Sequence, residues 1–200
     1  LSTLEQFPFA PSIRQQLAQL YLARQQPLLA LEQLLIVREQ LPSRLGGNQI
    51  GLLYLHLEQW PRAAEEFRRL LDQDEAAAGA SNHYFLALAL IGESRYQEAI
   101  EQLQQVSPEA SIYRDAMLQL SYLQLQQGSV SEGSQILHLL LEQGIDDSEV
   151  YYYLVAFYQH QQDVLQAYQF AAEGVERHPS DARLLYQQGV VLDAMDQHEA

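Results

Sequence analysis

A small residue recurs along this sequence at a spacing close to 34 residues, each time at the start of a helical segment. The spacings between these residues are 33, 36, 34, 34 and 33, for Ala30, Ala63, Ala99, Gly133, Ala167 and Ala200. A period of this length is typical of arrays in which one short unit repeats, so we expect stacked helical hairpins rather than one globular core. The clearest unit runs from Ser148 to Asp181 and contains two short amphipathic patterns, a polar turn and Pro179 near its end.

Other positions repeat in the same phase when the units are numbered from residues 11, 44, 80, 114, 148 and 182. Position 8 is small in every unit but one: Ala18, Gly51, Ala87, Ser121, Val155 and Gly189. Position 7 is apolar in every unit but the last: Leu17, Ile50, Leu86, Leu120, Leu154 and Gln188. Position 24, on the core face of the second helix, is Leu34, Phe67, Leu103, Leu137 and Ala171.

In this pattern the chain resembles the tetratricopeptide repeat family, whose unit is a helix, a turn and a helix in 34 residues. The resemblance implies an all-α fold, an α-solenoid of about eleven helices in antiparallel hairpins that stack into a right-handed superhelix. It divides the chain into the tail of a preceding repeat, five repeats and a partial sixth, all in one solenoid domain: 1–10, 11–43, 44–79, 80–113, 114–147, 148–181 and 182–200.

Local departures from the pattern predict local changes. Pro42 and Pro179 stand at the closing position of their units, whereas Pro108 comes early, so we expect an altered join after the third repeat. Gly133 replaces alanine inside a helix at a cost of about 1 kcal/mol, which predicts the softest hairpin. The extra residues EAAAGAS in the second unit predict a longer helix or a longer connection.

The two ends indicate a piece of a longer array. Pro8 falls at the closing position of a preceding repeat, although an ordinary loop proline reads equally well, and the sixth unit stops at Ala200 as its second helix begins. An array cut in this way leaves one hairpin face uncovered. We therefore expect Leu185, Val191 and Leu192 to be partly exposed, with self-association through that end.

Composition excludes several kinds of partner and of chemistry. The formal net charge of -15 argues against nucleic acid and against anionic membranes, and it favours a cationic partner. No apolar run is long enough to span a bilayer, and Leu1–Ala10 lacks a signal-peptide pattern. Cysteine is absent, which removes disulfides and thiolate chemistry but does not separate cytoplasm, slightly favoured here, from periplasm.

No catalytic or cofactor motif is found, so we expect neither an enzyme nor a cofactor. The sequence has no lysine for a phosphate-binding loop, and Gly128–Gly133 does not match the spacing of a serine nucleophile elbow. The six histidines are scattered, and no metal site is predicted. The paired carboxylates Glu65 and Glu66, and Asp146 and Asp147, read as solvated surface charge.

The resemblance implies a binding groove lined by the first helix of each hairpin, at positions 2, 5, 6, 9, 12 and 13. The candidate binding residues at these positions are Gln16, Asn48, Gln49, Tyr84, Gln119, Tyr122, Tyr152, Tyr153, Tyr186 and Gln187. Family members that grip chaperone C-termini use a clamp of Lys, Arg and Asn, of which only Asn48 has a counterpart. The glutamines resemble instead the asparagine ladder of O-linked N-acetylglucosamine transferases, since a side-chain amide pairs with both N–H and C=O of a peptide. Glutamine is also an ordinary helix-surface residue, so both interpretations stay open.

The tyrosines suggest anchors for a partner, because they combine apolar area with a polar tip. Tyr151 is expected in the core, and Tyr122 and Tyr153 are expected to be the most exposed aromatics of the groove; the alternative is that they pack between hairpins. The sequence thus predicts a scaffold for protein–protein interaction that binds a peptide or a partner helix. Two alternatives remain: the substrate-presenting repeats of a larger enzyme such as a glycosyltransferase, and a structural subunit of a bacterial envelope or secretion assembly.

Overall fold

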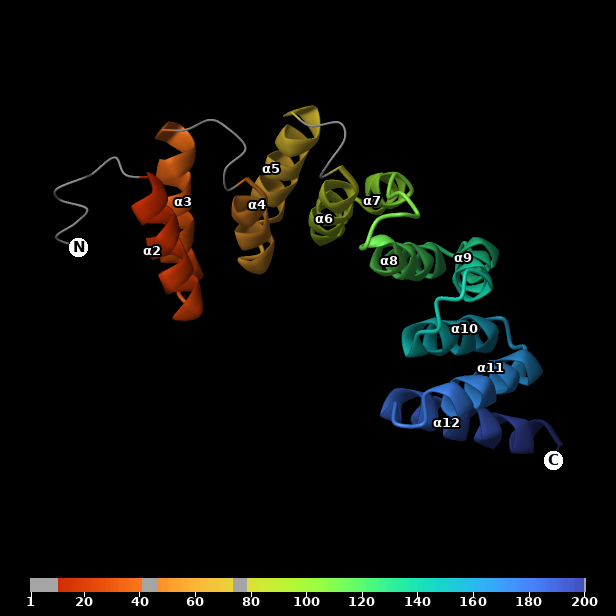
Figure 1. Cartoon of the computed structure of the whole chain (residues 1–200). Helices are drawn as coiled ribbons and strands as arrows, with labels where there is room; N and C mark the ends of the chain where they lie inside the picture. Colours follow the sequence, from red (N-terminus) through yellow and green to blue (C-terminus); the bar gives the residue numbers. More distant parts are fainter. Residues whose placement is uncertain (1–10, 41–46, 74–78, 200) are drawn as a thin grey trace. The chain divides into compact units, whose positions relative to one another are not determined.

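The computed structural model describes residues 11–40, 47–73 and 79–199, which form eleven α-helices and no strand (Figure 1). One compact unit, unit 1, contains α2 (Pro11–Ala23), α3 (Pro27–Gln40), α4 (Gly47–His56), α5 (Trp60–Gln73), α6 (Gly79–Gly92) and α7 (Tyr96–Leu103). The other, unit 2, contains α8 (Tyr113–Gln126), α9 (Val130–Glu142), α10 (Ser148–His160), α11 (Val164–Arg177) and α12 (Ala182–Glu199). The predicted all-α fold of helical hairpins is confirmed. Pro8, Pro42 and Ala200, on which three sequence predictions rest, lie outside the described residues.

Every hairpin closes through a turn of the same construction. Three residues separate the two helices, and the middle one, at position 15, has a positive φ angle: Gln25 (57°), Glu58 (55°), Ser94 (60°), Gly128 (80°) and Gln162 (61°). The next N–H then donates to a carbonyl five residues back, for example from Asp163 to Tyr158 at 2.9 Å and from Arg95 to Leu90 at 2.8 Å. This bond satisfies a carbonyl that the end of the helix would leave without a partner, and it reverses the chain within one turn.

The repeated apolar positions form the core. All five small residues in the first turn of the second helices are buried, as are all five residues at position 24 and four of the five apolar residues at position 7. Tyr151 is also buried, as predicted, and burial raises the pKa of its hydroxyl to about 12. The sequence period therefore identified the packed face of both helices in each hairpin.

Glycines in the helices make room for aromatic rings. A Cβ on Gly51 would stand 2.6 Å from the Phe67 ring, and one on Gly133 would stand 2.3 Å from Phe157. Gly133 thus has a packing reason that its helix propensity does not reveal: the ring of α10 lies where an alanine methyl group would be.

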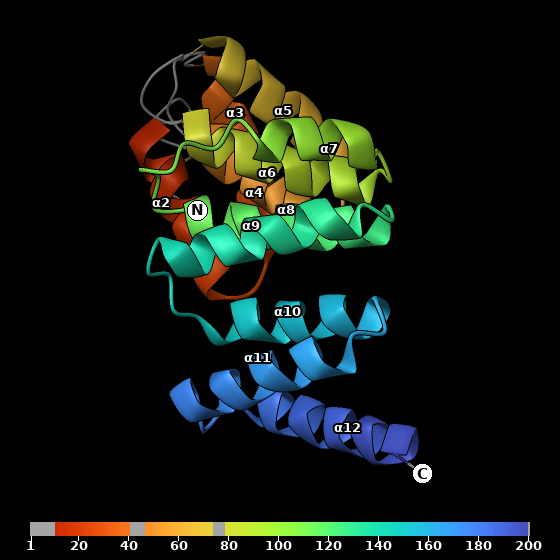
Figure 2. The same cartoon turned by 90° about the vertical axis from the view of Figure 1, so that its right-hand side faces the viewer.

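In unit 2 the helices stack in the order of the chain, and α10 packs against both α8 and α12 as well as against α11 (Figure 2). Val191 of α12 is fully buried in a cluster with Val155, Ala167 and Ala171. The expectation that Val191 is partly exposed is therefore wrong, because α12 turns this residue toward the preceding hairpin. Leu185 and Leu192 are exposed, as expected.

The join after the third repeat is altered, as Pro108 predicted. Helix α7 has 8 residues, whereas the other second helices have 13 or 14. The chain then passes through turns from Gln104 to Ile112, and the boundary between the two compact units falls within this segment. Most of the extra residues of the second unit, 74–78, lie outside the described residues.

One of the paired carboxylates is not a surface charge. Glu66 is only 4% exposed and accepts hydrogen bonds from Arg38 of the preceding hairpin, at 2.7 Å, and from Arg69, at 2.5 Å. The prediction of a solvated Glu66 is wrong, because two guanidinium groups compensate the burial of its charge. Asp147 also has a structural role, since it accepts a hydrogen bond from the Glu149 N–H at 2.9 Å and so caps α10.

In the described part of the chain no helix is both long and apolar enough to cross a membrane.

Candidate functional site

The predicted binding residues of unit 2 lie on three first helices that follow one another in the stack. Helix α8 carries Gln119 and Tyr122, α10 carries Tyr152 and Tyr153, and α12 carries Tyr186 and Gln187. We call the surface formed by these six residues the first-helix face. Because α10 packs between α8 and α12, side chains from three repeats can contact one extended ligand.

Three tyrosines of this face form a connected cluster. The ring centroids of Tyr122 and Tyr153 are 6.0 Å apart, and those of Tyr152 and Tyr153 are 5.6 Å apart with the planes at 73°. These are ordinary distances for edge-to-face and tilted aromatic pairs. Gln126 donates a hydrogen bond to the Tyr122 hydroxyl at 2.6 Å, which fixes the polar tip of that ring. Part of the tyrosine surface therefore packs between hairpins, as the alternative interpretation holds.

Arg183 joins this cluster from the start of α12. Its guanidinium carbon lies 5.6 Å from the centroid of the Tyr152 ring, within the range of a cation–π contact. It also pairs with Glu149 at 3.3 Å and with Asp181 at 3.0 Å. Sequence reasoning missed Arg183 and Gln126. Arg183 stands at position 2 of its repeat and Gln126 at position 13, and the family resemblance assigns both positions to the groove.

The charges around the cluster shift its ionisable groups. Burial raises the pKa of the Tyr153 hydroxyl, and the negative charge of Glu149 raises it further. Hydrogen bonds from Arg183 and Ser148 hold the pKa of Asp181 below its usual range. Tyr153 therefore stays neutral at physiological pH and acts as a hydrogen-bonding group rather than as an acid.

Exposure on this face differs from the prediction. Tyr186 is 73% exposed, whereas Tyr122 is 37% exposed and Tyr153 is half-buried. The expectation that Tyr122 and Tyr153 are the most exposed aromatics is wrong, because each lies beside another tyrosine ring while Tyr186 extends from the last described helix.

The remaining predicted residues lie in unit 1. Gln16 is exposed on α2, Asn48 and Gln49 are exposed in the first turn of α4, and Tyr84 is half-buried on α6 with its ring 5.4 Å from Phe85. A glutamine ladder stays a prediction. In unit 2 its two members, Gln119 and Gln187, are separated by Tyr153 at the equivalent position of α10.

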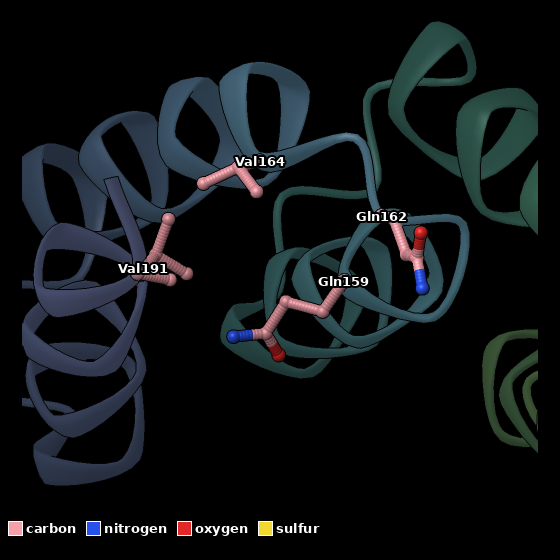
Figure 3. A pocket seen from close by; sticks show the side chains of 5 residues that line it. Gln159, Gln162, Val164 and Val191 are labelled. Carbon is pink, nitrogen blue, oxygen red and sulfur yellow. The ribbon is translucent and has the colours of Figure 1, made fainter. Parts of the chain in front are cut away.

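A pocket that sequence reasoning missed lies beside the first-helix face. It has a volume of about 380 Å³ and is lined by Gln159, Gln162, Val164, Val191 and Ala194, from α10, its turn, α11 and α12. We call it the junction pocket. Figure 3 shows Val164 and Val191 on neighbouring helices, with the amide groups of Gln159 and Gln162 on the side of the α10 turn. Gln159 and Ala194 stand at positions 12 and 13, so the groove positions of the family could have indicated this place.

Within the described ranges, no three or more His, Asp or Glu residues are grouped so that they could hold a metal ion. The first-helix face and the junction pocket together offer aromatic surface, amide groups and carboxylates. These groups suit recognition of another molecule.

Comparison with known proteins agrees with the repeat pattern. Residues 90–156 match the family model described as tetratricopeptide repeat. The match covers about a third of the chain, and the described helical hairpins fit an array of such repeats. No curated protein matches the sequence.

Several solved structures, two of them described as TPR proteins, have a similar fold. YrrB, described as a TPR protein with an unusual peptide-binding site, is 16% identical, with a TM-score of 0.70 over 94% of this chain and 96% of that one. MamA from Desulfovibrio magneticus is 17% identical, with a TM-score of 0.75 over 86% of this chain and 97% of that one. A thermophilic TPR protein of Thermus thermophilus is 17% identical, with a TM-score of 0.61 over 92% of this chain and 99% of that one. At such identities the likeness shows the fold alone, and it confirms the predicted α-solenoid.

Proposed function

We propose that the chain is a protein–protein interaction scaffold whose first-helix face binds an extended segment of a partner protein. The observation that carries this proposal is the cluster of Tyr122, Tyr152 and Tyr153, with Arg183 beside it, on helices from three successive repeats. Tyrosine is enriched at binding hot spots, since its ring gives contact area at little cost in conformational entropy. The fold supports the same conclusion, because a neighbour with this architecture is described by its peptide-binding site.

The chemistry of the face suits a neutral or basic segment. The hydroxyl of Tyr153 has no hydrogen-bond partner among the described residues, and Gln119 and Gln187 supply amides that both donate and accept. The net charge of -15 favours a cationic partner by long-range attraction. We propose binding as the role of this chain, without catalysis by its own residues.

The test is selection of binding peptides from a random display library on the purified chain, followed by titration of the selected peptides. Replacing both Tyr122 and Tyr153 by alanine should weaken binding at least tenfold, because two anchors of roughly 1 kcal/mol or more each are lost. The matched control is the double variant Leu139→Ala and Leu165→Ala, which removes exposed apolar side chains from the second helices α9 and α11.

Circular dichroism should show unchanged helix content in both variants. Peptides that bind the tyrosine variant as tightly as the original chain, or that lose affinity only in the control, would show that the partner lies elsewhere.

A further inference from the structure

The junction pocket has an equivalent in an earlier hairpin, and there the chain fills the space itself. Val164 and Ala194 stand at positions 17 and 13 of successive repeats, where the second and third repeats have Trp60 and Gly92. The Trp60 indole lies directly against Gly92: a Cβ on Gly92 would stand 2.3 Å from an indole carbon. This junction between α5 and α6 is closed by an aromatic ring.

The residues of the later junction are all too small to do the same. Valine replaces tryptophan at Val164, and alanine stands at Ala194, while Val191 is turned into the core and forms one wall. The result is a cavity of about 380 Å³ at the place where an indole lies in the earlier repeat. Cavities that bind small ligands have volumes of roughly 300–1,000 Å³, so this space is large enough for one large side chain.

The walls of the pocket combine apolar and polar groups (Figure 3). Val164, Val191 and Ala194 provide apolar surface. The cluster that contains Val191 also packs against Tyr158 and Phe170, whose stacked rings have centroids 5.3 Å apart. The side-chain amides of Gln159 and Gln162 make no hydrogen bond to any described residue, so either can accept a bond from an indole N–H. An apolar wall with one acceptor is the environment that buried tryptophan requires.

The charged residues near the pocket indicate which residue would stand next to a bound indole in the partner segment. Asp163 lies in the turn that carries part of the pocket, and Asp193 and Asp196 lie on the α12 segment that forms its wall. The arginines of α11 and α12, Arg177 and Arg183, stand near the opposite ends of these helices and are paired with carboxylates there. Charge complementarity therefore favours a basic residue next to the aromatic one.

We propose that the junction pocket binds a tryptophan side chain of the partner segment, with an arginine or lysine beside it attracted by Asp163, Asp193 and Asp196. This inference rests on the proposed function, because Gln159 and Ala194 lie at the edge of the face on which the partner segment is placed. It adds the residue type that anchors the segment. The indole of the partner takes the place that Trp60 takes within the chain.

The test uses the whole chain labelled with ¹⁵N and a short peptide, Gly-Ser-Trp-Arg-Gly-Ser, added in an NMR titration. Saturable shifts should appear in the amides of residues 159–164 and 191–194. A peptide with alanine in place of tryptophan should bind at least tenfold more weakly. Equal shifts with both peptides, or shifts spread over the acidic surface without saturation, would overturn the proposal.

A self-filling variant provides the sharpest comparison. The double change Val164→Trp and Ala194→Gly rebuilds the Trp60–Gly92 pair in the later junction and should reduce tryptophan-peptide binding at least tenfold while raising the melting temperature. Leu165→Ala, a change of the exposed neighbour of Val164, is the control and should bind as the original chain does. If the double variant folds poorly, Ala194→Leu alone should narrow the pocket and give the same loss, and unreduced binding in a folded variant contradicts the proposal.

The two proposals fail in different ways. The short peptide should still bind the Tyr122→Ala and Tyr153→Ala variant, because those rings do not line the pocket. Loss of library peptides in the tyrosine variant without any tryptophan effect would support the proposed function and overturn the pocket assignment. If the short peptide binds more weakly without its tryptophan, but library peptides bind the tyrosine variant unchanged, the pocket assignment is supported and the proposed binding face is overturned.

Discussion

At the scale of single residues, position 15 shows how one backbone angle organises the chain. Five hairpins turn through a residue with positive φ, yet only Gly128 among them is a glycine. A side chain in this left-handed region costs roughly 1–2 kcal/mol, so Gln25, Glu58, Ser94 and Gln162 are held there by the packing of their hairpins. The packing of the hairpin therefore sets the backbone conformation at position 15, and a glycine there only lowers its energetic cost.

Gly128→Ala should lower the free energy of unfolding by about 1 kcal/mol, because alanine must adopt the φ of 80° that glycine adopts freely. The added Cβ meets nothing within 4 Å, so the backbone angle alone is responsible. Urea unfolding followed by circular dichroism measures the change. Gly79→Ala is the control: its Cβ also meets nothing within 4 Å, its φ is ordinary, and we expect no loss of stability. Equal effects at both sites would contradict the explanation.

At the scale of helices, a smaller residue on one helix accompanies a larger side chain on the helix that packs against it. The anchor of α9 is Gly133 and it receives Phe157 of α10, whereas the anchor of α11 is Ala167 and it contacts Val191 of α12. Where the incoming side chain is the larger phenylalanine, the anchor lacks the methyl group of alanine, so both contacts are closely packed. The sequence marks Gly133 as a weak helix residue, and only the contact with Phe157 explains why it is there.

Gly133→Ala should destabilise the chain by about 1–2 kcal/mol, since the clash with Phe157 outweighs the gain in helix propensity of about 1 kcal/mol. Combining it with Phe157→Leu should cost less than the two single changes together, because the smaller side chain leaves space for the methyl group. Denaturant unfolding of the two single variants and the double variant measures this coupling. Strict additivity would show that the two residues do not constrain each other.

At the scale of the whole molecule, the charge is far from balanced. Acidic residues number 26 and arginines 11, and several arginines are already paired within the repeats, as Arg38 and Arg69 are with Glu66. The remaining carboxylates repel one another in the folded chain. This excess is a property of solubility and partner choice, and it does not specify the fold.

Added salt should therefore stabilise the chain. Raising NaCl from about 10 mM to about 500 mM shortens the screening length from roughly 30 Å to below 10 Å, which weakens the repulsion more than it weakens the buried Glu66 pairs. We expect the melting temperature to rise by several degrees in calorimetry. A fall over this range would mean that exposed ion pairs outweigh the repulsion.

Much of the fold could be predicted from the sequence, because a repeat imposes the same local rule several times. The burial of the anchors from Ala30 to Ala167 and of the position-24 residues from Leu34 to Ala171 follows from the period, and the altered join after the third repeat follows from Pro108. Recognition without catalysis was inferred from the repeat resemblance and the lack of a catalytic motif, and it stays a prediction. Each of these depends on residues close together in one unit.

The tertiary structure alone decided what depends on contacts between units of the repeat. Glu66 is buried because Arg38 reaches it from another hairpin, and Val191 is covered because α12 packs back onto α11. The junction pocket exists because Val164 and Ala194 meet where Trp60 and Gly92 meet earlier in the chain. A pattern within one repeat determines which face of a helix is buried, but the volume left between two repeats depends on side chains about 30 residues apart, which only the packed structure brings together.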